Sequence, residues 1–422
     1  MQVRGRLFTR LLGTPFKAPN LGFCKYRSAG WEMADPTVAI LETLARRGPA
    51  DRAWLAEATG FSPATVGRAV SRLRRDGIVR EWTGTPTGLG RPPRFVELDG
   101  RSAFVVGIDA GGHTLRAAVG DFHGTIQTRT SRPIRDPLDR EALLGDIVAL
   151  VDEVAASLER GALRAIVVGV SGIVDHAGDR VLLSPDLPGL DGGPLAAVLQ
   201  ERLGVLAAID NDDLLAAVGE ASAGAAIGCH DVVFLSLGYG LGAGLIIGGR
   251  PVRGASNAAG AIAYLAPGRL ADRASGRAIP ARYRAALLED RAVQAYQAQP
   301  AVDDARVVFQ LASAGDPVAR RVVSEVVAEI GDLVIDVAAL LNPEVIVVGG
   351  GLADAGRALF GPLDQRLQTA IPYPPRLAPS ALGDAAVLHG AISLALALAR
   401  RGLASSDQPR RKQLVRRALA LL

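Results

Sequence analysis

The sequence predicts an α/β protein in which a winged helix-turn-helix precedes a larger body of two α/β lobes. Three short helical patterns and a basic hairpin occupy the first hundred residues, and strand and helix patterns alternate from residue 103 onward. At 422 residues the chain is too long for a single core. The predicted parts are a basic tail over 1–34, a winged helix-turn-helix over 35–98, a body over 103–400 and a basic carboxyl-terminal tail over 401–422. Within the body, the first lobe takes 103–219 and 385–400, and the second takes 220–384.

The composition is that of a globular protein, with 49% hydrophobic and 21% charged residues. Two cysteines are too few for a disulfide framework or a four-cysteine zinc site, and the five histidines are scattered, so we expect no metal and no cofactor. The longest apolar stretch, Val232–Gly249, is broken by glycines, which indicates strands and turns rather than a membrane span. We therefore expect a cytoplasmic protein without membrane contact.

The amino-terminal helices follow the order of a helix-turn-helix. Apolar residues at helical spacing predict a first helix over Val38–Arg47. Asp51 can cap a second helix, which Gly60 ends before a tight turn. Ser62 and the proline after it predict the start of a third helix, Pro63–Asp76.

The third helix has an apolar stripe on one side and an arginine-rich face on the other, which suits the major groove of DNA. Two short strands, Ile78–Trp82 and Phe95–Leu98, follow with a loop of glycine, proline and arginine between them, and predict a wing whose Arg91 can enter a minor groove. The predicted contacts to a double-stranded DNA operator are Ser62, Thr65, Arg68, Arg72, Arg75, Arg91 and Arg94. The alternative is that this basic unit serves only protein contacts.

Four segments of the body have glycines or carboxylates directly after a buried strand, where such residues can contact a ligand. Phe104–Asp121 predicts a strand, an Asp-x-Gly-Gly turn and a second strand, in which glycines let backbone N–H groups approach a phosphate. Asp210–Asp213 ends a strand, where carboxylates can meet a ligand or deprotonate a hydroxyl. A second glycine hairpin covers Leu237–Gly249, and Asn342–Leu352 is a buried strand that opens into three glycines.

In this order, the motifs resemble the ROK family, named for repressors, open reading frames and kinases, within the actin-like ATPase and sugar kinase (ribonuclease H-like) fold. The resemblance covers about Ala103–Arg400, and with the amino-terminal module the chain is similar to the transcriptional regulators of that family. It implies sugar contacts by Asn211 and Asp212, with Asp212 at the position of the catalytic base of a kinase. The implied nucleotide-binding residues are Asp109, Gly111, Gly112, Gly238, Gly240, Gly242, Gly349 and Gly350.

The chain departs from the kinase pattern at several positions. Ala261 and Tyr264 stand where the family has a glutamate that binds sugar hydroxyls and a histidine that binds both sugar and zinc. In place of the zinc loop, Leu265–Pro280 contains no cysteine or histidine. His113 replaces a threonine of the first phosphate loop, and Tyr239 replaces a small hydroxylated residue of the second. Each lost partner of a sugar removes about 1–3 kcal/mol of binding free energy, so we expect no catalytic residue and no kinase activity. Tyr264 either fills the emptied zinc region or contacts a ligand, and the glycines serve either the hairpins or a nucleotide.

The sequence thus predicts a DNA-binding transcriptional regulator, in the first place a repressor. Its body would sense a sugar or sugar phosphate and form a homodimer or a dimer of dimers on an inverted-repeat operator. Two alternatives remain, namely an ATP-dependent sugar kinase with an appended DNA-binding domain and a ligand-independent repressor whose body only dimerises. The carboxyl end, Arg400–Leu422, is basic and amphipathic, which indicates a solvated tail or a second DNA or membrane contact.

Overall fold

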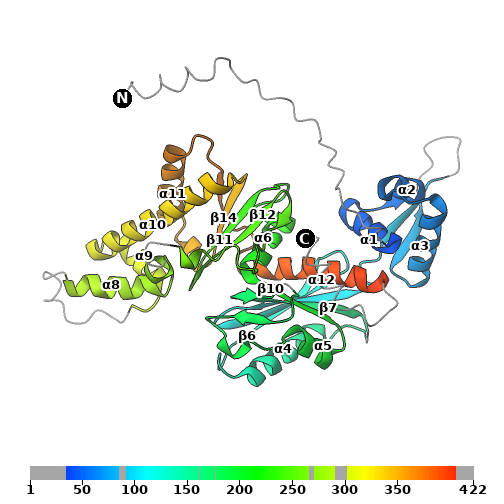
Figure 1. Cartoon of the computed structure of the whole chain (residues 1–422), viewed down its shortest axis with the longest axis horizontal. Helices are drawn as coiled ribbons and strands as arrows, with labels where there is room; N and C mark the ends of the chain where they lie inside the picture. Colours follow the sequence, from blue (N-terminus) through cyan, green and yellow to red (C-terminus); the bar gives the residue numbers. More distant parts are fainter. Residues whose placement is uncertain are drawn as a thin grey trace, which may run out of the picture. The chain divides into compact units, whose positions relative to one another are not determined.

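The computed structural model describes residues 35–84, 92–159, 161–175, 177–265, 270–289 and 302–404. The amino-terminal tail, the tip of the wing with Arg91 and the last part of the carboxyl-terminal tail lie outside the described residues. The mixed α/β class predicted from the sequence is confirmed, with a winged helix-turn-helix followed by two lobes that each contain a five-stranded sheet (Figure 1).

The winged helix-turn-helix has the predicted caps and a small sheet in the order β1-β3-β2. The Asp51 side chain accepts a hydrogen bond from the backbone N–H of Trp54, and Ser62 accepts one from that of Thr65. Gly60 ends the second helix with a φ of 75°, a conformation that favours glycine. The elements are α1 (Pro36–Arg47), β1 (Ala50–Asp51), α2 (Arg52–Thr59), α3 (Pro63–Arg75), β2 (Val79–Thr83) and β3 (Arg94–Leu98).

The first lobe is built on a sheet in the order β10-β7-β4-β5-β6, in which β4, β7 and β10 are parallel. Its strands are β4 (Phe104–Ala110), β5 (Thr114–Asp121), β6 (Ile126–Pro133), β7 (Leu163–Val170) and β10 (Leu206–Asn211). Two helices, α4 (Arg140–Ala155) and α5 (Ala196–Leu203), bury their apolar residues against one face. A small hairpin of β8 (Ile173–Val174) and β9 (Val181–Leu183) and a 3₁₀ turn, η2 (Pro188–Leu190), complete this lobe.

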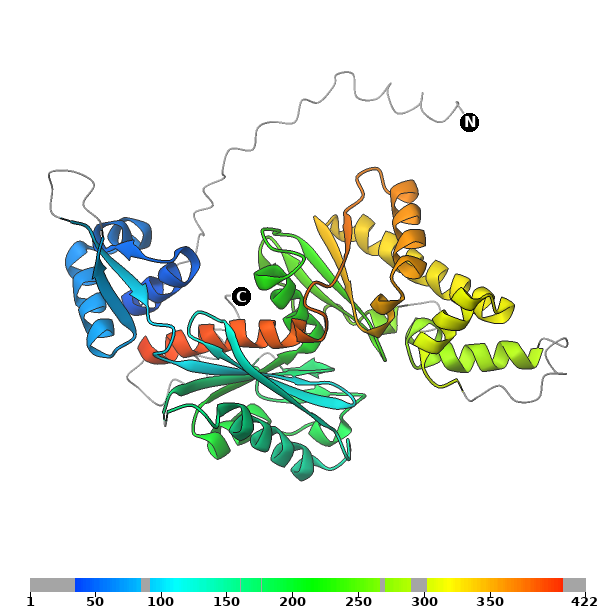
Figure 2. The same cartoon turned by 180° about the vertical axis from the view of Figure 1, so that it is seen from behind.

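The second lobe has a sheet in the order β13-β12-β11-β14-β15. Its strands are β11 (Val232–Leu237), β12 (Leu241–Ile247), β13 (Arg250–Pro251), β14 (Val345–Gly349) and β15 (Arg376–Pro379). One face is covered by a layer of helices, visible in Figure 2, that shares one apolar core with the sheet. These helices are α7 (Ala271–Ala274), α8 (Ala278–Glu289), α9 (Ala305–Ala314), α10 (Pro317–Leu341) and α11 (Arg357–Ala370), with 3₁₀ turns η3 (Ile262–Tyr264), η4 (Gly351–Ala355) and η5 (Gly383–Ala385).

Two further helices, α6 (Asp212–Ala223) and α12 (Ala386–Ala404), pack closely against each other. A methyl group on Gly390 of α12 would overlap the backbone oxygen of Leu215 in α6, and one on Gly219 would overlap that of Ala386. Helix α6 contacts strands of both sheets, whereas α12 covers the first sheet on the face opposite α4 and α5. Helix α12 has the length and hydropathy of a membrane span, but its apolar residues are packed against the sheet of the first lobe.

The end of α12 corrects one predicted boundary. The helix continues to Ala404, so Arg401, which we assigned to the tail, belongs to the folded body. Its side chain is buried and pairs with Glu42 of α1 at 3.2 Å. The guanidinium of Arg400 lies over the Phe122 ring at 5.5 Å, and burial lowers the pKa of this arginine to about 10. Because Arg400 and Arg401 both have partners within the folded body, the helix can continue past the apolar residues from which its end was predicted.

Candidate functional site

The polar face of α3 carries the predicted DNA contacts. Val66, Val70 and Leu73 are buried in the core of the winged helix-turn-helix and so turn the opposite face of the helix to solvent. On that face, Ser62 and Thr65 join their hydroxyls at 2.9 Å, and Arg68 donates to the Thr65 hydroxyl at 3.3 Å. This network holds three of the predicted contacts together at the start of the helix, where a recognition helix meets base edges.

The other predicted DNA contacts differ in their surroundings. Arg75 and Arg94 are exposed. Arg72 is also exposed, but it donates to the backbone oxygen of Leu403 in α12 at 3.4 Å and lies 3.8 Å from Asp76. Arg72 is therefore engaged within the chain. Sequence reasoning had no signal for this contact, because the two partners are far apart in the chain.

At the end of β4, Asp109 is 6% exposed and forms an ion pair with Arg116 at 3.1 Å. The two residues lie directly opposite each other in the β4–β5 hairpin, and Arg116 also reaches Asp384 at 3.4 Å. Burial raises the pKa of Asp109 to about 6, although the charge and hydrogen bond of Arg116 act in the opposite direction. The aspartate that the family resemblance assigns to nucleotide binding thus already has a cationic partner.

Asn211 and Asp212 lie at the start of α6, and the bonds of Asn211 are structural. The Asn211 side chain caps the helix by accepting from the Leu214 N–H, and it donates to the Gly172 backbone oxygen, both at 2.9 Å. Asp212 accepts from the backbone N–H of Asp213 at 2.9 Å. Burial, then the charges of Asp213 and Asp109, raise the pKa of Asp212 well above its ordinary value.

Asp213 adds a carboxylate that was not among the predicted ligand contacts. Its side chain lies against Gly242 of β12, where a methyl group would overlap the carboxylate. The Ser236 side chain hydrogen-bonds to it, yet burial raises the pKa of Asp213 to about 6. This carboxylate therefore lies beside Gly242, a glycine that the family resemblance assigns to nucleotide binding.

Two residues that depart from the kinase pattern, His113 in the first glycine loop and Tyr239 in the second, are in contact with each other. The rings of His113 and Tyr239 meet edge to face with their centroids 4.8 Å apart. Against the first loop, the carboxylate of Asp186 lies beside Gly112, where it accepts from the Ser171 hydroxyl at 3.1 Å. Asp186 and the ring contact were not predicted, because both depend on contacts between distant segments.

The remaining glycines of the predicted nucleotide site pack against one another. Gly350 has a φ of 82°, and a methyl group on it would lie 2.6 Å from the backbone oxygen of Leu237. The N–H of Gly238 donates to the Gly240 oxygen at 3.1 Å. A methyl group on Gly349 would press on the Phe234 ring, and Gly111 lies beside Asp109. These glycines are needed for backbone approach whether or not a nucleotide binds.

Two side chains of the second lobe bond to the first lobe beside Asn211. Arg253 pairs with the buried Asp210 at 2.6 Å. Asn257 donates to the backbone oxygen of Asp175 at 3.0 Å and has a φ of 55°, unusual for a residue other than glycine. Its amide oxygen is buried and has no hydrogen-bond partner among the described residues. Neither residue was predicted, although Asn257 lies only four positions before Ala261.

The residues at the two predicted sugar-binding positions, Ala261 and Tyr264, lie within the described part of the chain. Ala261 offers no polar side chain, and Tyr264 on η3 is 55% exposed. The part of the substituted zinc loop at 266–269 lies outside the described residues. Within the described ranges, no group of three or more histidine, cysteine, aspartate or glutamate side chains is placed to hold a metal ion.

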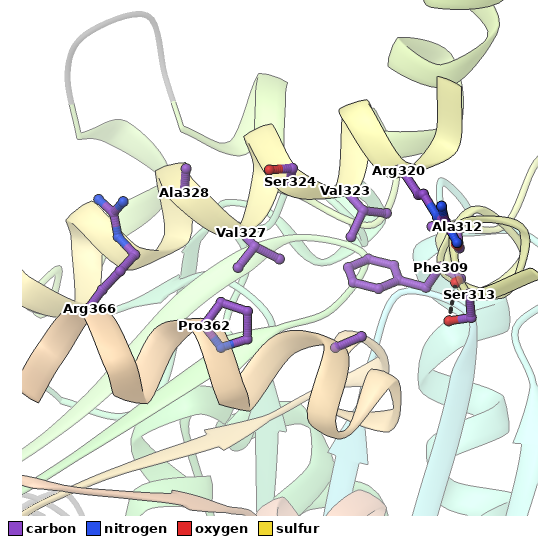
Figure 3. Close-up of a pocket in the computed structure, with 11 residues that line it drawn as sticks. Phe309, Ala312, Ser313, Arg320, Val323, Ser324, Val327, Ala328, Pro362 and Arg366 are labelled. Atoms are coloured by element: carbon purple, nitrogen blue, oxygen red, sulfur yellow. Dashed lines mark hydrogen bonds between the residues drawn. The ribbon is translucent and has the colours of Figure 1, made fainter. Parts of the chain in front are cut away.

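A separate groove of about 480 Å³ lies between α9, α10 and α11 (Figure 3). Phe309, Val323, Val327 and Pro362 give it an apolar lining, with arginines at its margin. It contains none of the predicted ligand contacts, and it offers few polar groups to a sugar. The polar residues where side chains of the two lobes meet, Asn211, Asp212 and Asn257, are therefore the better candidate for a ligand site.

Comparison with known proteins agrees with this architecture. Residues 35–80 match a winged helix-turn-helix DNA-binding family. The chain is 26% identical to the xylose repressor of Caldicellulosiruptor bescii, over 85% of this chain and 94% of that protein. It is 24% identical to the DNA-binding transcriptional dual regulator NagC of Escherichia coli, over 79% of this chain and 84% of that protein.

Solved structures share the fold. A ROK family transcriptional regulator, described as a homologue of the Escherichia coli MLC protein, superposes with a TM-score of 0.71 at 20% identity and covers 92% of this chain and 97% of its own. A ROK family glucokinase from Streptomyces griseus, solved with glucose and AMPPNP, covers 69% of this chain and 99% of its own, with a TM-score of 0.61 at 26% identity. Residues 105–398, more than half of the chain, match the ROK family, and the chain belongs to that family.

Proposed function

We propose that this protein is a DNA-binding transcriptional regulator, a repressor in the first place, whose ROK body senses a sugar without phosphorylating it. The observation that carries this proposal is the combination of an exposed arginine face on α3 with a kinase-like cleft whose phosphate loops contact the protein's own side chains. The regulators among its relatives, named for xylose and described as DNA-binding, support the same reading.

The cleft does not fit phosphoryl transfer from a nucleotide. Such a reaction needs a metal held by carboxylates and phosphates cradled by backbone N–H groups. Here Asp109 is paired with Arg116, and carboxylates lie against Gly112 and Gly242. Ala261 and Tyr264 remove two groups that would orient a sugar for attack. Because a ROK family glucokinase shares the fold, the absence of kinase activity is tested by a coupled assay of phosphate transfer from ATP to sugars.

The body also dimerises in this proposal, as a homodimer or a dimer of dimers, and so presents two α3 helices to an inverted-repeat operator in the cytoplasm. A path for the sugar signal runs through α6, which carries Asn211 and Asp212 at its start and packs on α12 through Gly219 and Gly390. Helix α12 in turn bonds to α1 through Arg401 and to α3 through Leu403. A ligand that shifts the start of α6 therefore acts on elements in contact with the DNA-binding unit.

The test is binding of the purified full chain to fragments of its own upstream region, at two salt concentrations and with a panel of sugars. Specific, salt-sensitive binding that one sugar releases is the expected result. Binding that ignores every sugar would replace this proposal by a ligand-independent repressor. Transfer of phosphate from ATP to any sugar of the panel in a coupled assay would replace it by a kinase.

A further inference from the structure

We infer that the polar residues between the two lobes bind a sugar in the uncharged, unphosphorylated form and reject sugar phosphates and nucleotides. This inference rests on the proposed sensing function and specifies its ligand. It follows from what lies against the two phosphate loops, from the cations available in the body, and from the polar groups left for a neutral ligand.

The first phosphate loop presents carboxylates rather than a free anion site. The Asp186 carboxylate lies against Gly112, held by the Ser171 hydroxyl at 3.1 Å. Asp109 stands at the other side of the same turn and is paired with Arg116. A phosphate placed on this loop would meet Asp186 before it reached the backbone N–H groups, and the two negative charges repel each other.

The second glycine hairpin also has a carboxylate beside it, against Gly242 on strand β12, whereas a methyl group on Gly240 at the tip would meet nothing within 4 Å. The Asp213 carboxylate fills the space that the missing side chain of Gly242 leaves, and Ser236 fixes it there. Tyr239 at the tip of this loop contacts His113 of the first loop, so the two loops touch through these side chains. Charge and steric contact thus act against the same class of ligand.

The body has few cations that could offset these charges. The sequence has no lysine between Lys25 and Lys412, so only arginines could bind a phosphate there. Arg116 is shared between Asp109 and Asp384, and Arg253 is paired with Asp210. Arg277 is exposed and approaches the second loop through its backbone N–H, which donates to the Tyr239 oxygen at 3.4 Å. The Arg116 Nη1 atom does approach the first loop, 3.9 Å from where a methyl group on Gly111 would lie, but the same nitrogen is paired with the Asp109 carboxylate.

The cleft does offer acceptors for hydroxyl groups. The buried amide oxygen of Asn257 has no donor among the residues that the structure describes, although its NH₂ group is bonded to Asp175. Asn211 bonds to Gly172 in the same segment, so the two amides flank one stretch of the first lobe. A buried acceptor without a donor is unfavourable, so a small rearrangement that exposed this oxygen to a sugar hydroxyl would satisfy it. The carboxylate of Asp212 can accept further hydroxyls.

The experiment compares matched ligands on the full-length protein. Xylose, glucose and N-acetylglucosamine are each tested beside their phosphate esters, together with magnesium AMPPNP, by calorimetry and by release of operator DNA. At pH 7.5 we expect at least one free sugar to bind and its phosphate ester to bind roughly 100-fold more weakly, as expected for like charges brought together in a partly buried site.

A variant with Asp186→Asn and Asp213→Asn tests the cause. It should narrow the difference between sugar and sugar phosphate by about tenfold or more, because two of the repelling charges are gone. The control variant, Asp152→Asn with Asp364→Asn, changes net charge equally at two exposed positions on α4 and α11 and should leave the difference unchanged.

The outcomes separate the inference from the function on which it rests. If a sugar phosphate or AMPPNP binds the wild type as well as any free sugar, the inference is wrong while sugar sensing stands. If the Asp186/Asp213 variant folds and discriminates as the wild type does, the carboxylates are not the cause and the inference is also wrong. If no compound binds or releases DNA, the proposed sensing function fails and the inference falls with it.

Discussion

Replacing Asp213 by asparagine should stabilise the protein at neutral pH, which is unusual for a substitution in a binding cleft. The carboxylate lies among other carboxylates, and burial raises its pKa from the ordinary 3.8 to about 6. Asparagine has almost the same shape, can keep a hydrogen bond with Ser236, and carries no charge. The substitution therefore removes the unfavourable burial of a charge and changes little else.

The sign and size of the effect follow from proton linkage. The folded state binds the Asp213 proton more tightly than the unfolded state, so this group stabilises the fold most below pH 3.8, and the contribution is lost as pH rises through about 6. The gap between the two pKa values corresponds to about 3 kcal/mol at pH 7.5. Coupling to Asp212 and an imperfect fit of the amide reduce the expected gain to about 1–2 kcal/mol.

Urea unfolding of wild type and Asp213→Asn at pH 7.5 and pH 4 measures this gain. The free energy of unfolding of the variant should exceed that of the wild type at pH 7.5, and the difference should shrink toward zero at pH 4. Asp152→Asn, an exposed change on α4, serves as the control and should have no effect at either pH. A difference of equal size at both pH values, or a variant less stable than wild type at pH 7.5, would refute the reasoning.

Three further predictions test the packing and the DNA surface. Gly390→Ala should lower the free energy of unfolding by about 3 kcal/mol or more, because the added methyl group would overlap the Leu215 backbone oxygen. Gly145→Ala in α4, where an added methyl group has nothing within 4 Å, should raise the free energy of unfolding by up to about 1 kcal/mol. Denaturant titration of both variants measures these changes. Arg401→Met should destabilise by about 3 kcal/mol by leaving Glu42 without its partner, and adding Glu42→Gln should recover part of that loss in a double-mutant cycle. Arg68→Ala should weaken operator binding by about 1–3 kcal/mol and relax the preference for the operator sequence. The control, Arg129→Ala at an exposed position on β6, should change neither operator affinity nor sequence preference. Fluorescence anisotropy with operator and scrambled DNA measures both properties for each variant.

The elements that the sequence predicts well are those specified by neighbouring residues. The cap at Ser62, the positive φ at Gly60 and the strand pair of the wing each depend on a few consecutive positions, and the structure confirms them. The fold of the body was also predictable, because its buried strands and glycine turns follow one another along the chain in the order that is typical of the ROK family. The end of α12 was placed too early, because Arg401 has a partner in a helix near the other end of the chain.

The contacts within the cleft were harder to predict, and the reason differs from residue to residue. The pair of Asp109 and Arg116 was within reach, since a four-residue turn in that hairpin puts the two directly opposite each other. His113 and Tyr239 were each recognised as departures, but nothing local indicates that their rings meet. Asp186 and Asn257 lie on irregular segments whose position depends on the packing of whole lobes, and no periodic pattern marks them.

The glycines of a kinase-like chain are poor evidence for nucleotide binding, since the fold itself requires them. Gly350 must approach Leu237, and Gly242 must leave room for Asp213, so both would be retained in a protein that never binds ATP. The side chains that face the loops carry more information, because their charge decides whether a phosphate is attracted or repelled. In this chain the first loop faces Asp186 and the second faces Asp213, and a ring pair joins the loops. Ala261 and Tyr264 lack the groups that the resemblance assigns to sugar binding, and the carboxylates beside the glycine loops are the residues through which we propose that phosphate is rejected as well.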